Sequence, residues 1–439
     1  MTREALALEI IRSLQDRGHQ ALLVGGCVRD RLLGIPPKDY DVGTDAKPDQ
    51  IAAYFPGSLL VGAHFGVVLV RGPEGAQVEV ATFRSESHYA DGRRPDQVTF
   101  ETDPTLDARR RDFTVNGLMQ NPLTGEALDF VGGKADLSAR VIRAIGDPKL
   151  RFAEDYLRML RAVRFAARLG FSIDPETLAA IRARAHCITK ISMERIREEL
   201  VRILTEGGAK RGLELLDECD LLAHILPEVK VFQGVEQPPE FHPEGDVWTH
   251  VLLMLDALRD PSVTLAFGVL LHDVGKPPTF TVADRIRFNG HAEIGAEMSK
   301  QILGRLKFSN DDLENITALV ANHMRFKDVQ QMRLSTLKRF LNLPNFDEHL
   351  ELHRLDCLSS NGYTAAYDFV QTKLREFVQT ELTPPRLLSG RDLIEAGYQP
   401  GPAFRRALDA VETAQLEGEI QSRDEALALA RAVLDQAAA

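Results

Sequence analysis

The chain of 439 residues is long enough for two to four domains, and its 44% hydrophobic and 27% charged residues are typical of a globular protein. No segment reaches the apolar length of a membrane span, and Met1–Ala5 opens an amphipathic helix rather than a signal peptide, so we expect no membrane partner and a cytoplasmic location. The formal net charge of −11 excludes indiscriminate nucleic-acid binding, because contacts to phosphates require cations.

The charge is unevenly distributed along the chain. From Lys134 to Arg211, lysine and arginine together exceed aspartate and glutamate by seven residues. This excess is typical of an anion-binding surface on an otherwise acidic protein, although an arginine-rich helical region would give the same count. The four cysteines are scattered and form no Cys-x-x-Cys pair, which favours reduced thiols over disulfides or a zinc knuckle.

After an amphipathic helix over residues 2–18, the stretch Leu22–Thr44 combines several chemical signals. Its apolar run ends at Gly25-Gly26, where a backbone without Cβ atoms can bend and lie against a phosphate. A short helix from about Cys27 to Leu33 follows, and Gly34 with two prolines ends it.

Two carboxylates come next on an extended segment. Asp39 and Asp41 are two residues apart and therefore point to the same face, while Tyr40 and Val42 face a core. Adjacent carboxylates repel one another unless a cation lies between them, so the pair either has raised pKa values or binds a hard metal such as Mg²⁺. A solvated turn is the plainer alternative.

The remaining elements of the first part are predicted from hydrophobic periodicity. We expect a helix over Pro48–Phe55, strands over Val61–Val70 and Gln77–Thr82, and a polar, mobile loop over Arg84–Asp103. Glu79 could complete a three-carboxylate cluster if its strand pairs beside Asp39 and Asp41; otherwise it is an exposed edge residue. Asp129–Lys134 reads as a strand that runs into a turn.

From Asp136 the period changes from two to 3.6, which predicts a mixed α/β head followed by an all-helical remainder. The clearest helix covers Arg151–Leu169, and it would place Asp155 and Arg158 on one face. Another predicted helix, N-capped by Ser192, runs to Leu200, and residues 237–245 are expected to form a linker. No internal repeat is present.

Several ordered motifs together resemble one family. Gly25-Gly26-x-x-Arg29-Asp30 with Asp39-x-Asp41, then Arg110–Asn116, then Glu154-Asp155-x-x-Arg158-x-x-Arg161, are similar to the bacterial-type (class II) tRNA nucleotidyltransferases and their poly(A) polymerase relatives. The second half resembles the helical body and HD phosphohydrolase domain of these enzymes. The resemblance implies a polymerase-β-type α/β nucleotidyltransferase head followed by an all-α neck, body and HD region.

The resemblance also implies the head's reaction: template-independent addition of CMP and AMP, from CTP and ATP, to a tRNA 3′ end. Asp39 and Asp41 would bind two Mg²⁺ ions, with Glu79 as a third catalytic carboxylate. The nucleotide-binding residues carried over from the family pattern are Gly25, Gly26, Arg29, Arg111, Asp112, Asn116, Glu154, Asp155, Arg158, Arg161 and Arg164.

The choice of nucleobase follows from hydrogen-bond chemistry. Cytosine and adenine present an amino donor beside a ring-nitrogen acceptor, whereas uracil and guanine present a carbonyl beside a ring N–H. Asp155 and Arg158, an acceptor beside a forked donor, would therefore accept C and A and reject U and G; an isolated Asp-x-x-Arg is otherwise a surface ion pair. The Arg84–Asp103 loop, through Asp91, Arg93 and Arg94, is expected to allow the change from C to A.

The histidines of the second half match an HD site. His250, His272, Asp273 and Asp356 occupy the four ligand positions, and His291 and His323 match the extra histidines of fuller sites. The resemblance implies Mn²⁺, Ni²⁺, Co²⁺ or Mg²⁺ and hydrolysis of a 2′,3′-cyclic phosphate or other phosphoester, with a metal-free scaffold as the alternative.

The predicted domains are a head (1–135), a neck (136–205), a helical body and linker (206–240), an HD domain (241–360) and a helical tail (361–439). The alternatives to CCA addition are a bacterial poly(A) polymerase, an enzyme that adds only CC or only A, an HD phosphohydrolase with a nucleotide-sensing head, and an RNA-binding chaperone. Gly62–Val68 and the lack of a long basic tail favour a tRNA enzyme over a poly(A) polymerase. The sequence does not determine the oligomeric state.

Overall fold

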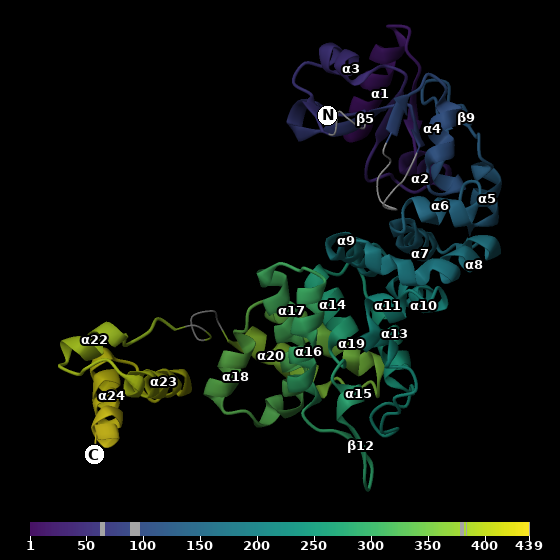
Figure 1. The fold of residues 1–439 in the computed structure, drawn as a ribbon. Helices are drawn as coiled ribbons and strands as arrows, with labels where there is room; N and C mark the ends of the chain where they lie inside the picture. The colour runs from purple at the N-terminus through teal and green to yellow at the C-terminus, as the bar shows by residue number, and fades with distance from the viewer. Residues whose placement is uncertain (62–65, 88–96, 378–381, 383, 439) are drawn as a thin grey trace. The chain divides into compact units, whose positions relative to one another are not determined.

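The structure is a computed structural model that describes residues 1–61, 66–87, 97–377, 382 and 384–438 (Figure 1). The chain divides into two compact units, one of residues 1–230 with 305–307 and the other of residues 231–304 with 308–439. Among the described residues, no helix is both long enough and apolar enough to cross a membrane.

A seven-stranded mixed sheet forms the centre of the first unit. Its strand order is β3-β4-β5-β2-β1-β8-β9, and within this sheet β2 pairs in parallel with β5 while the other neighbours are antiparallel. The strands are β1 (Ala21–Val24), β2 (Asp41–Thr44), β3 (Leu59–Leu60), β4 (Val67–Arg71), β5 (Gln77–Thr82), β8 (Met119–Gln120) and β9 (Ala127–Leu128).

The sheet follows the predicted alternation of side chains. Along β5, Val78, Val80 and Thr82 are buried while Glu79 is exposed, and Tyr40 and Val42 are buried as expected. A Cβ atom at Gly43 would lie 2.8 Å from the side chains of Phe83 and Val24, so the core approaches the backbone of β2 closely at this point.

Helices pack against the sheet and then continue beyond it. In Figure 1, α1 and α3 lie beside the strands of the head, and α1 contacts β1, β2 and β5. The helical segments of the first unit are α1 (Arg3–Gln15), α2 (Gly26–Leu32), α3 (Pro48–Tyr54), α4 (Pro104–Arg110), α5 (Gly133–Ala139), α6 (Pro148–Glu154), α7 (Leu157–Leu169), α8 (Pro175–Arg184), α9 (Met193–Thr205), α10 (Ala209–Glu218), α11 (Leu222–Ile225) and α12 (Pro227–Lys230).

Four sequence-based expectations for the first unit are wrong in detail. The predicted strand Val61–Val70 is replaced by antiparallel β3 and β4, and its residues 62–65 lie outside the described part of the chain. The predicted loop 84–103 begins and ends in a hairpin of β6 (Arg84–Ser87) and β7 (Gln97–Phe100). The strand expected at Asp129 ends at Leu128, and the side chain of Ser192 makes no capping hydrogen bond to α9.

The predicted helix Arg151–Leu169 is also interrupted. Asp155 has extended backbone angles (φ −148°, ψ 108°) between α6 and α7, and its side chain accepts from the backbone N–H of Leu157 at 3.0 Å. Aspartate competes in this way with helical hydrogen bonding, so it begins a new helix rather than continuing the old one. Asp155 and Arg158 therefore do not share a face of one helix.

The second unit is largely helical. Its helices are α13 (Val247–Ala257), α14 (Val263–Leu271), α15 (Lys276–Thr279), α16 (His291–Arg305), α17 (Asn310–Asn322), α18 (Leu334–Leu341), α19 (Phe346–Ser359), α20 (Ala365–Glu376), α22 (Gly390–Glu395), α23 (Pro402–Glu417) and α24 (Arg423–Ala438). Short strands interrupt the predicted all-helical region, namely parallel β10 (Val141–Ile142) and β11 (Ser172–Ile173) in the first unit and the hairpin of β12 (Phe280–Val282) and β13 (Ile286–Phe288) in the second.

Candidate active site

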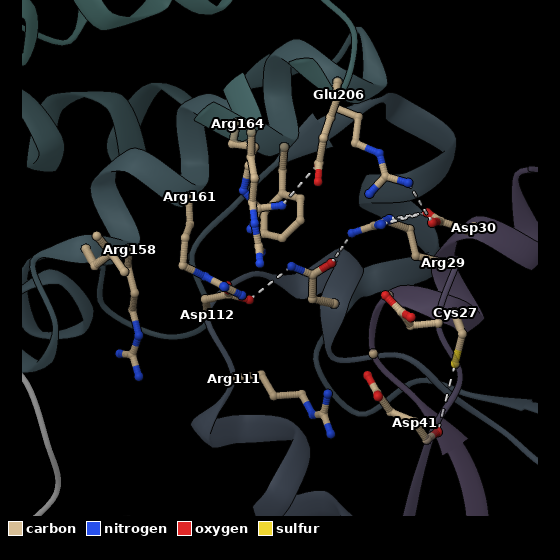
Figure 2. A pocket seen from close by; sticks show the side chains of 18 of the residues that line it. Cys27, Arg29, Asp30, Asp41, Arg111, Asp112, Arg158, Arg161, Arg164 and Glu206 are labelled. Atoms are coloured by element: carbon tan, nitrogen blue, oxygen red, sulfur yellow. Dashed lines mark hydrogen bonds and ion pairs between the residues drawn. The ribbon is translucent and has the colours of Figure 1, made fainter. Parts of the chain in front are cut away.

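A cavity of about 580 Å³ in the first unit collects most of the predicted head residues (Figure 2). Ten of its lining residues are arginine or lysine and six are acidic, so it suits a polyanion. One wall is the turn from β1 into α2. Gly25 has φ +76° and ψ −133°, a conformation that side chains disfavour, and the backbone of Gly25 and Gly26 lines the cavity.

The acidic residues lie at the edge where β2 begins. Asp41 is its first residue and is directly opposite Glu79 in the parallel pair with β5, which fulfils the pairing condition set by the sequence. Burial, Glu79 and Asp39 together raise the pKa of Asp41 to about 6, against the opposing effect of Arg111. Asp39 precedes the strand, its side chain is 77% exposed, and Arg3 binds it at 2.6 Å.

Asp39 and Asp41 both line the cavity, whereas Glu79 is not among its lining residues. Carboxylates arranged in this way fit a hard divalent cation, because a cation offsets the burial and the repulsion that together raise the pKa of Asp41.

Behind the turn, Arg29 lies in a buried network. Its guanidinium donates to Asp30 (2.8 Å from Nε) and to the side-chain oxygen of Asn116 (2.6 Å), and Asn116 in turn donates to Asp112 at 3.0 Å. Burial alone would raise the pKa of Asp112, but Arg161 and these hydrogen bonds outweigh burial and hold that pKa well below its usual range. Arg29 is only 2% exposed, so it supports the wall of the cavity with most of its donors already used.

The arginines of α7 form the opposite wall. Figure 2 shows Arg158, Arg161 and Arg164 projecting from the helix toward the cavity, with Asp41 and Arg111 across from them. Arg161 binds Asp112 (Nε–Oδ2 2.8 Å), and Arg164 binds buried Glu199 (2.7 Å). The guanidinium of Arg164 also lies 4.2 Å from the centre of the Phe165 ring.

The predicted base-selecting residues reach the cavity from the break between α6 and α7. Asp155 and Arg158 both line it, but they bind other residues. Asp155 accepts from Arg195 of α9 at 3.1 Å, and Arg158 donates to Glu154 and to the backbone oxygen of Arg151. Glu154 is not a lining residue, because its carboxylate is directed at Arg151 and Arg158.

In the second unit, the predicted HD residues converge. Asp273 Oδ1 lies 3.7 Å from His291 Nε2 and 3.8 Å from His323 Nε2, and Asp273 Oδ2 lies 3.1 Å from His272 Nε2. His250 Nε2 is 3.2 Å from Asp356 Oδ1. The ligand atoms of His250, His272 and Asp273 lie within 4.8 Å of one another, so all six predicted residues belong to one cluster. A cavity of about 690 Å³ beside it is lined by His291, His323 and Asp356.

The tautomers of this cluster leave lone pairs facing inward. The Nδ1 atoms of His272, His291 and His323 lie 2.6–2.9 Å from the backbone oxygens of Val269, Phe288 and Val320. A carbonyl oxygen only accepts, so Nδ1 carries the proton and Nε2 does not. His291 Nε2 and His323 Nε2 are 3.1 Å apart, an arrangement that requires a proton or a cation between them.

Several buried nitrogen and oxygen atoms of the cluster are available to bind a metal ion. Among the described residues, His250 Nε2, His272 Nε2 and Asp273 Oδ2 are inaccessible to solvent and make no well-aligned hydrogen bond, although charged or ring groups lie 2.7–3.2 Å from each of them. Imidazole nitrogens and carboxylates that converge in this way fit a transition-metal ion. The chemistry of the donors therefore agrees with the metal site that the sequence predicts.

Comparison with known proteins identifies both units. The family described as "Poly A polymerase head domain" matches residues 21–143, "Probable RNA and SrmB-binding site of polymerase A" matches residues 170–233, and "HD domain" matches residues 246–353. The CCA-adding enzyme of Limosilactobacillus fermentum is 31% identical over 94% of this chain and 93% of its own length. The chain belongs to the CCA-adding enzyme family.

Two further comparisons agree with this assignment to the CCA-adding enzymes. The enzyme of Levilactobacillus brevis is 45% identical, but that alignment spans only 47% of this chain and 52% of the relative. The crystal structure of the Bacillus stearothermophilus CCA-adding enzyme in complex with CTP has a TM-score of 0.75 and 28% identity, and the match covers 98% of this chain and 96% of that one. The chain is therefore a tRNA nucleotidyltransferase whose α/β head precedes a mostly helical region, as predicted.

The cavity of this CCA-adding family member also contains residues that the sequence analysis missed. Arg168 continues the three- and four-residue spacing of Arg161 and Arg164 along α7, so helical periodicity could have found it. Asp30 and Lys38 also line the cavity; each is adjacent in sequence to a predicted site residue, and Asp30 belongs to the quoted motif. No local signal marks Arg195, Arg202 and Glu206, which reach the cavity from α9 and its C-terminal end.

Proposed function

We propose that the first unit adds CMP and AMP, without a nucleic-acid template, to the 3′ end of tRNA. One observation carries the proposal: a single cavity is lined both by the carboxylates Asp39 and Asp41 and by Asp155 and Arg158, the residues that match the family's base-selecting motif. Metal chemistry and base selection would then act on the same nucleotide.

Asp39 and Asp41 would hold two Mg²⁺ ions, with Glu79 beside Asp41. When bound, such ions lower the pKa of the primer 3′-hydroxyl and neutralise the triphosphate. The chain's own residues would orient the nucleotide: Gly25 and Gly26 through their backbone, and the guanidinium groups of Arg111, Arg161 and Arg164 through charge. Arg29 and Asn116 would keep Asp112 and Arg161 in place, since both belong to the same hydrogen-bonded network.

Asp155 and Arg158 would select the base. The wrong base would leave buried polar groups unpaired at a cost of about 1–3 kcal/mol each, which disfavours U and G relative to C and A. Arg158 would have to exchange part of its bonding to Glu154 for the base.

A tRNA that ends at the discriminator base tests this function. CTP alone should add two nucleotides, ATP alone none, both together three, and UTP or GTP none. Asp41→Asn should abolish all incorporation. A long tail formed from ATP alone would instead show a poly(A) polymerase, and addition that stops at CC with both nucleotides would show a partial enzyme.

For the second unit we propose a metal-dependent phosphohydrolase, favoured by the facing Nε2 atoms of His291 and His323. The metal ligands would be His250, His272, Asp273 and Asp356, together with the extra histidines His291 and His323, and Mn²⁺, Ni²⁺, Co²⁺ and Mg²⁺ are the candidate ions. Such an ion supplies an activated water for attack on a phosphoester, for example a 2′,3′-cyclic phosphate. Hydrolysis of 2′,3′-cAMP or bis-p-nitrophenyl phosphate under Mn²⁺ or Ni²⁺ should be lost in His272→Ala, and equal rates in both proteins would leave only a scaffold.

A further inference from the structure

The segment Gln237–Asp246 is not a free linker, because it is bonded to the histidine cluster. Gln237 is 4% exposed and accepts from Lys276 Nζ at 2.6 Å, and Lys276 lies 2.7 Å from Asp273. Asp246 fixes the far end, since it accepts from Thr249 at the start of α13 and from the backbone N–H of Gly234. This segment therefore holds side chains against the cluster at defined positions.

Glu244 makes the most specific of these contacts. Its side chain is 7% exposed, and its Oε1 lies 2.7 Å from His250 Nδ1. The other three histidines of the cluster donate from Nδ1 to backbone oxygens, so His250 alone among these four donates to a carboxylate. An ionised carboxylate accepts more strongly than a carbonyl, and it makes the opposite ring nitrogen a better donor of electron density.

We propose that Glu244 is a positioning residue for the metal site of the second unit: it holds the His250 ring with Nδ1 protonated, so that Nε2 faces Asp356 and the ion. This proposal rests on the HD metal site proposed above. Glu244 itself does not touch the ion. The same Oε1 accepts from His242 Nδ1 at 2.9 Å, and the His242 and His250 rings are 5.0 Å apart in an edge contact, so Glu244 also links His250 to a residue that lines the cavity.

A different role for the same residues is that His242, Glu244 and His250 together hold an ion of their own, since their ligand atoms lie within 4.8 Å of one another. Two observations favour positioning. Both histidines direct Nδ1 at a single oxygen of Glu244, which is a hydrogen-bond arrangement, and an ion on His250 Nδ1 would take the place of the proton that fixes its tautomer. The two roles differ in the number of ions bound.

The test is Co²⁺ binding to the full-length chain, measured by calorimetry in an Asp41→Asn background that removes the proposed head site. Glu244→Gln should weaken binding about 10–100-fold, with the stoichiometry unchanged. Its melting temperature in EDTA should equal that of the parent, because an amide of the same shape remains. Glu240→Gln is the matched control, since Glu240 is an exposed glutamate of the same segment, and it should bind Co²⁺ as the parent does.

Each other outcome overturns the proposal in a distinguishable way. Equal affinity in Glu244→Gln and Glu240→Gln would exclude positioning by Glu244. Loss of one ion from the stoichiometry would make Glu244 a ligand. A weaker affinity accompanied by a lower melting temperature in EDTA would mean that Glu244 only supports the fold, and absence of Co²⁺ binding to the parent would overturn the HD metal site itself.

Discussion

At the scale of single residues, the head site contains aspartates whose ionised forms burial disfavours. Asp41 has a raised pKa because burial and Glu79 oppose its ionised form, whereas Asp112 keeps a low pKa because Arg161 and Asn116 outweigh its burial. The two carboxylates thus differ in how their negative charge is balanced. The protein's own arginine and asparagine stabilise the charge of Asp112, whereas no group of the protein fully offsets the charge of Asp41, and a bound cation would do so.

This difference predicts how the stability of Asp41→Asn depends on pH. The pKa of Asp41 is higher in the folded chain than in the unfolded one, so its ionised form destabilises the fold, and this cost grows as the pH rises from about 4 through about 6. In EDTA, Asp41→Asn should therefore be more stable than the parent by about 3 kcal/mol at pH 7.5 and by only about 1 kcal/mol at pH 4.5. Urea unfolding followed by circular dichroism measures both values; the same difference at the two pH values would refute the burial and repulsion assigned to Asp41.

Asp30 of α2 is expected to stabilise the contact between α2 and α7. It accepts a hydrogen bond from Arg29 of the same helix and one from Arg168 of α7 at 3.1 Å. Asp30→Ala leaves Arg29 buried without its main ionic partner and should lower the local stability of α2 and α7 by about 3–5 kcal/mol. Native-state hydrogen exchange of these two helices measures the change.

Glu9→Ala, on an exposed face of α1, is the control for Asp30→Ala and should change stability by less than about 0.5 kcal/mol. Protection factors that are alike in the two variants would show that Asp30 does not couple the helices.

At the scale of elements, hydrophobic periodicity predicted strands and helices correctly where apolar side chains alternate regularly. It failed where a polar side chain forms a hydrogen bond with the backbone and interrupts the helix. The strand Gln77–Thr82 was predicted to the residue, because valines alternate with exposed polar residues there. The helix 151–169 was not, because Asp155 caps Leu157 and starts a second helix, a local contact that hydrophobic spacing does not report. Hydrophobic spacing also does not report the contacts of residues 237–245, which therefore looked like a linker. Gln237 and Glu244 are polar, and their hydrogen-bond partners, Lys276 and His250, lie 39 and 6 residues further along the chain.

The segment between β6 and β7 is predicted to be needed for the addition of the final A. Asp91, Arg93 and Arg94 lie between these strands and outside the described residues, and they are the positions assigned to the change from C to A. Replacing residues 91–94 with a glycine linker should leave CC addition intact and abolish the final A, as seen by gel analysis of products on one tRNA that ends at the discriminator base and another that ends in CC. Unimpaired addition of A would refute a role for this loop.

At the scale of the whole molecule, the described part of the chain contains the two metal sites that we propose, one in each compact unit. Each site is formed by residues of its own unit, so we expect the two activities to be independent of one another. His272→Ala should lose phosphoester hydrolysis and keep nucleotide addition within about twofold, and Asp41→Asn should show the reverse, with addition reduced by at least about 100-fold. Parallel assays of both reactions on both variants measure this. Loss of both activities in either variant would contradict the separation.

Sequence motifs identified the family and the head residues because each motif has a fixed, short internal spacing. The residues of the histidine cluster are widely separated in sequence apart from His272-Asp273, and the resemblance to HD domains identified them. The domain boundaries at residues 135, 205, 240 and 360 and the cytoplasmic location remain predictions. Residues such as Arg195 and Glu244 escaped notice because their partners are set by the packing of separate segments, which no local spacing encodes.

We propose above all that the carboxylates that hold the metal and the residues that select the base act on one nucleotide. A crystal structure with CTP and Mg²⁺ tests it directly. We predict the triphosphate and metal against Asp39 and Asp41, with Asp39 released from Arg3, and the cytosine edge within hydrogen-bond distance of Asp155 and Arg158. A nucleotide bound with its base remote from Asp155 and Arg158, or with Asp39 and Asp41 turned into solvent, would contradict the account.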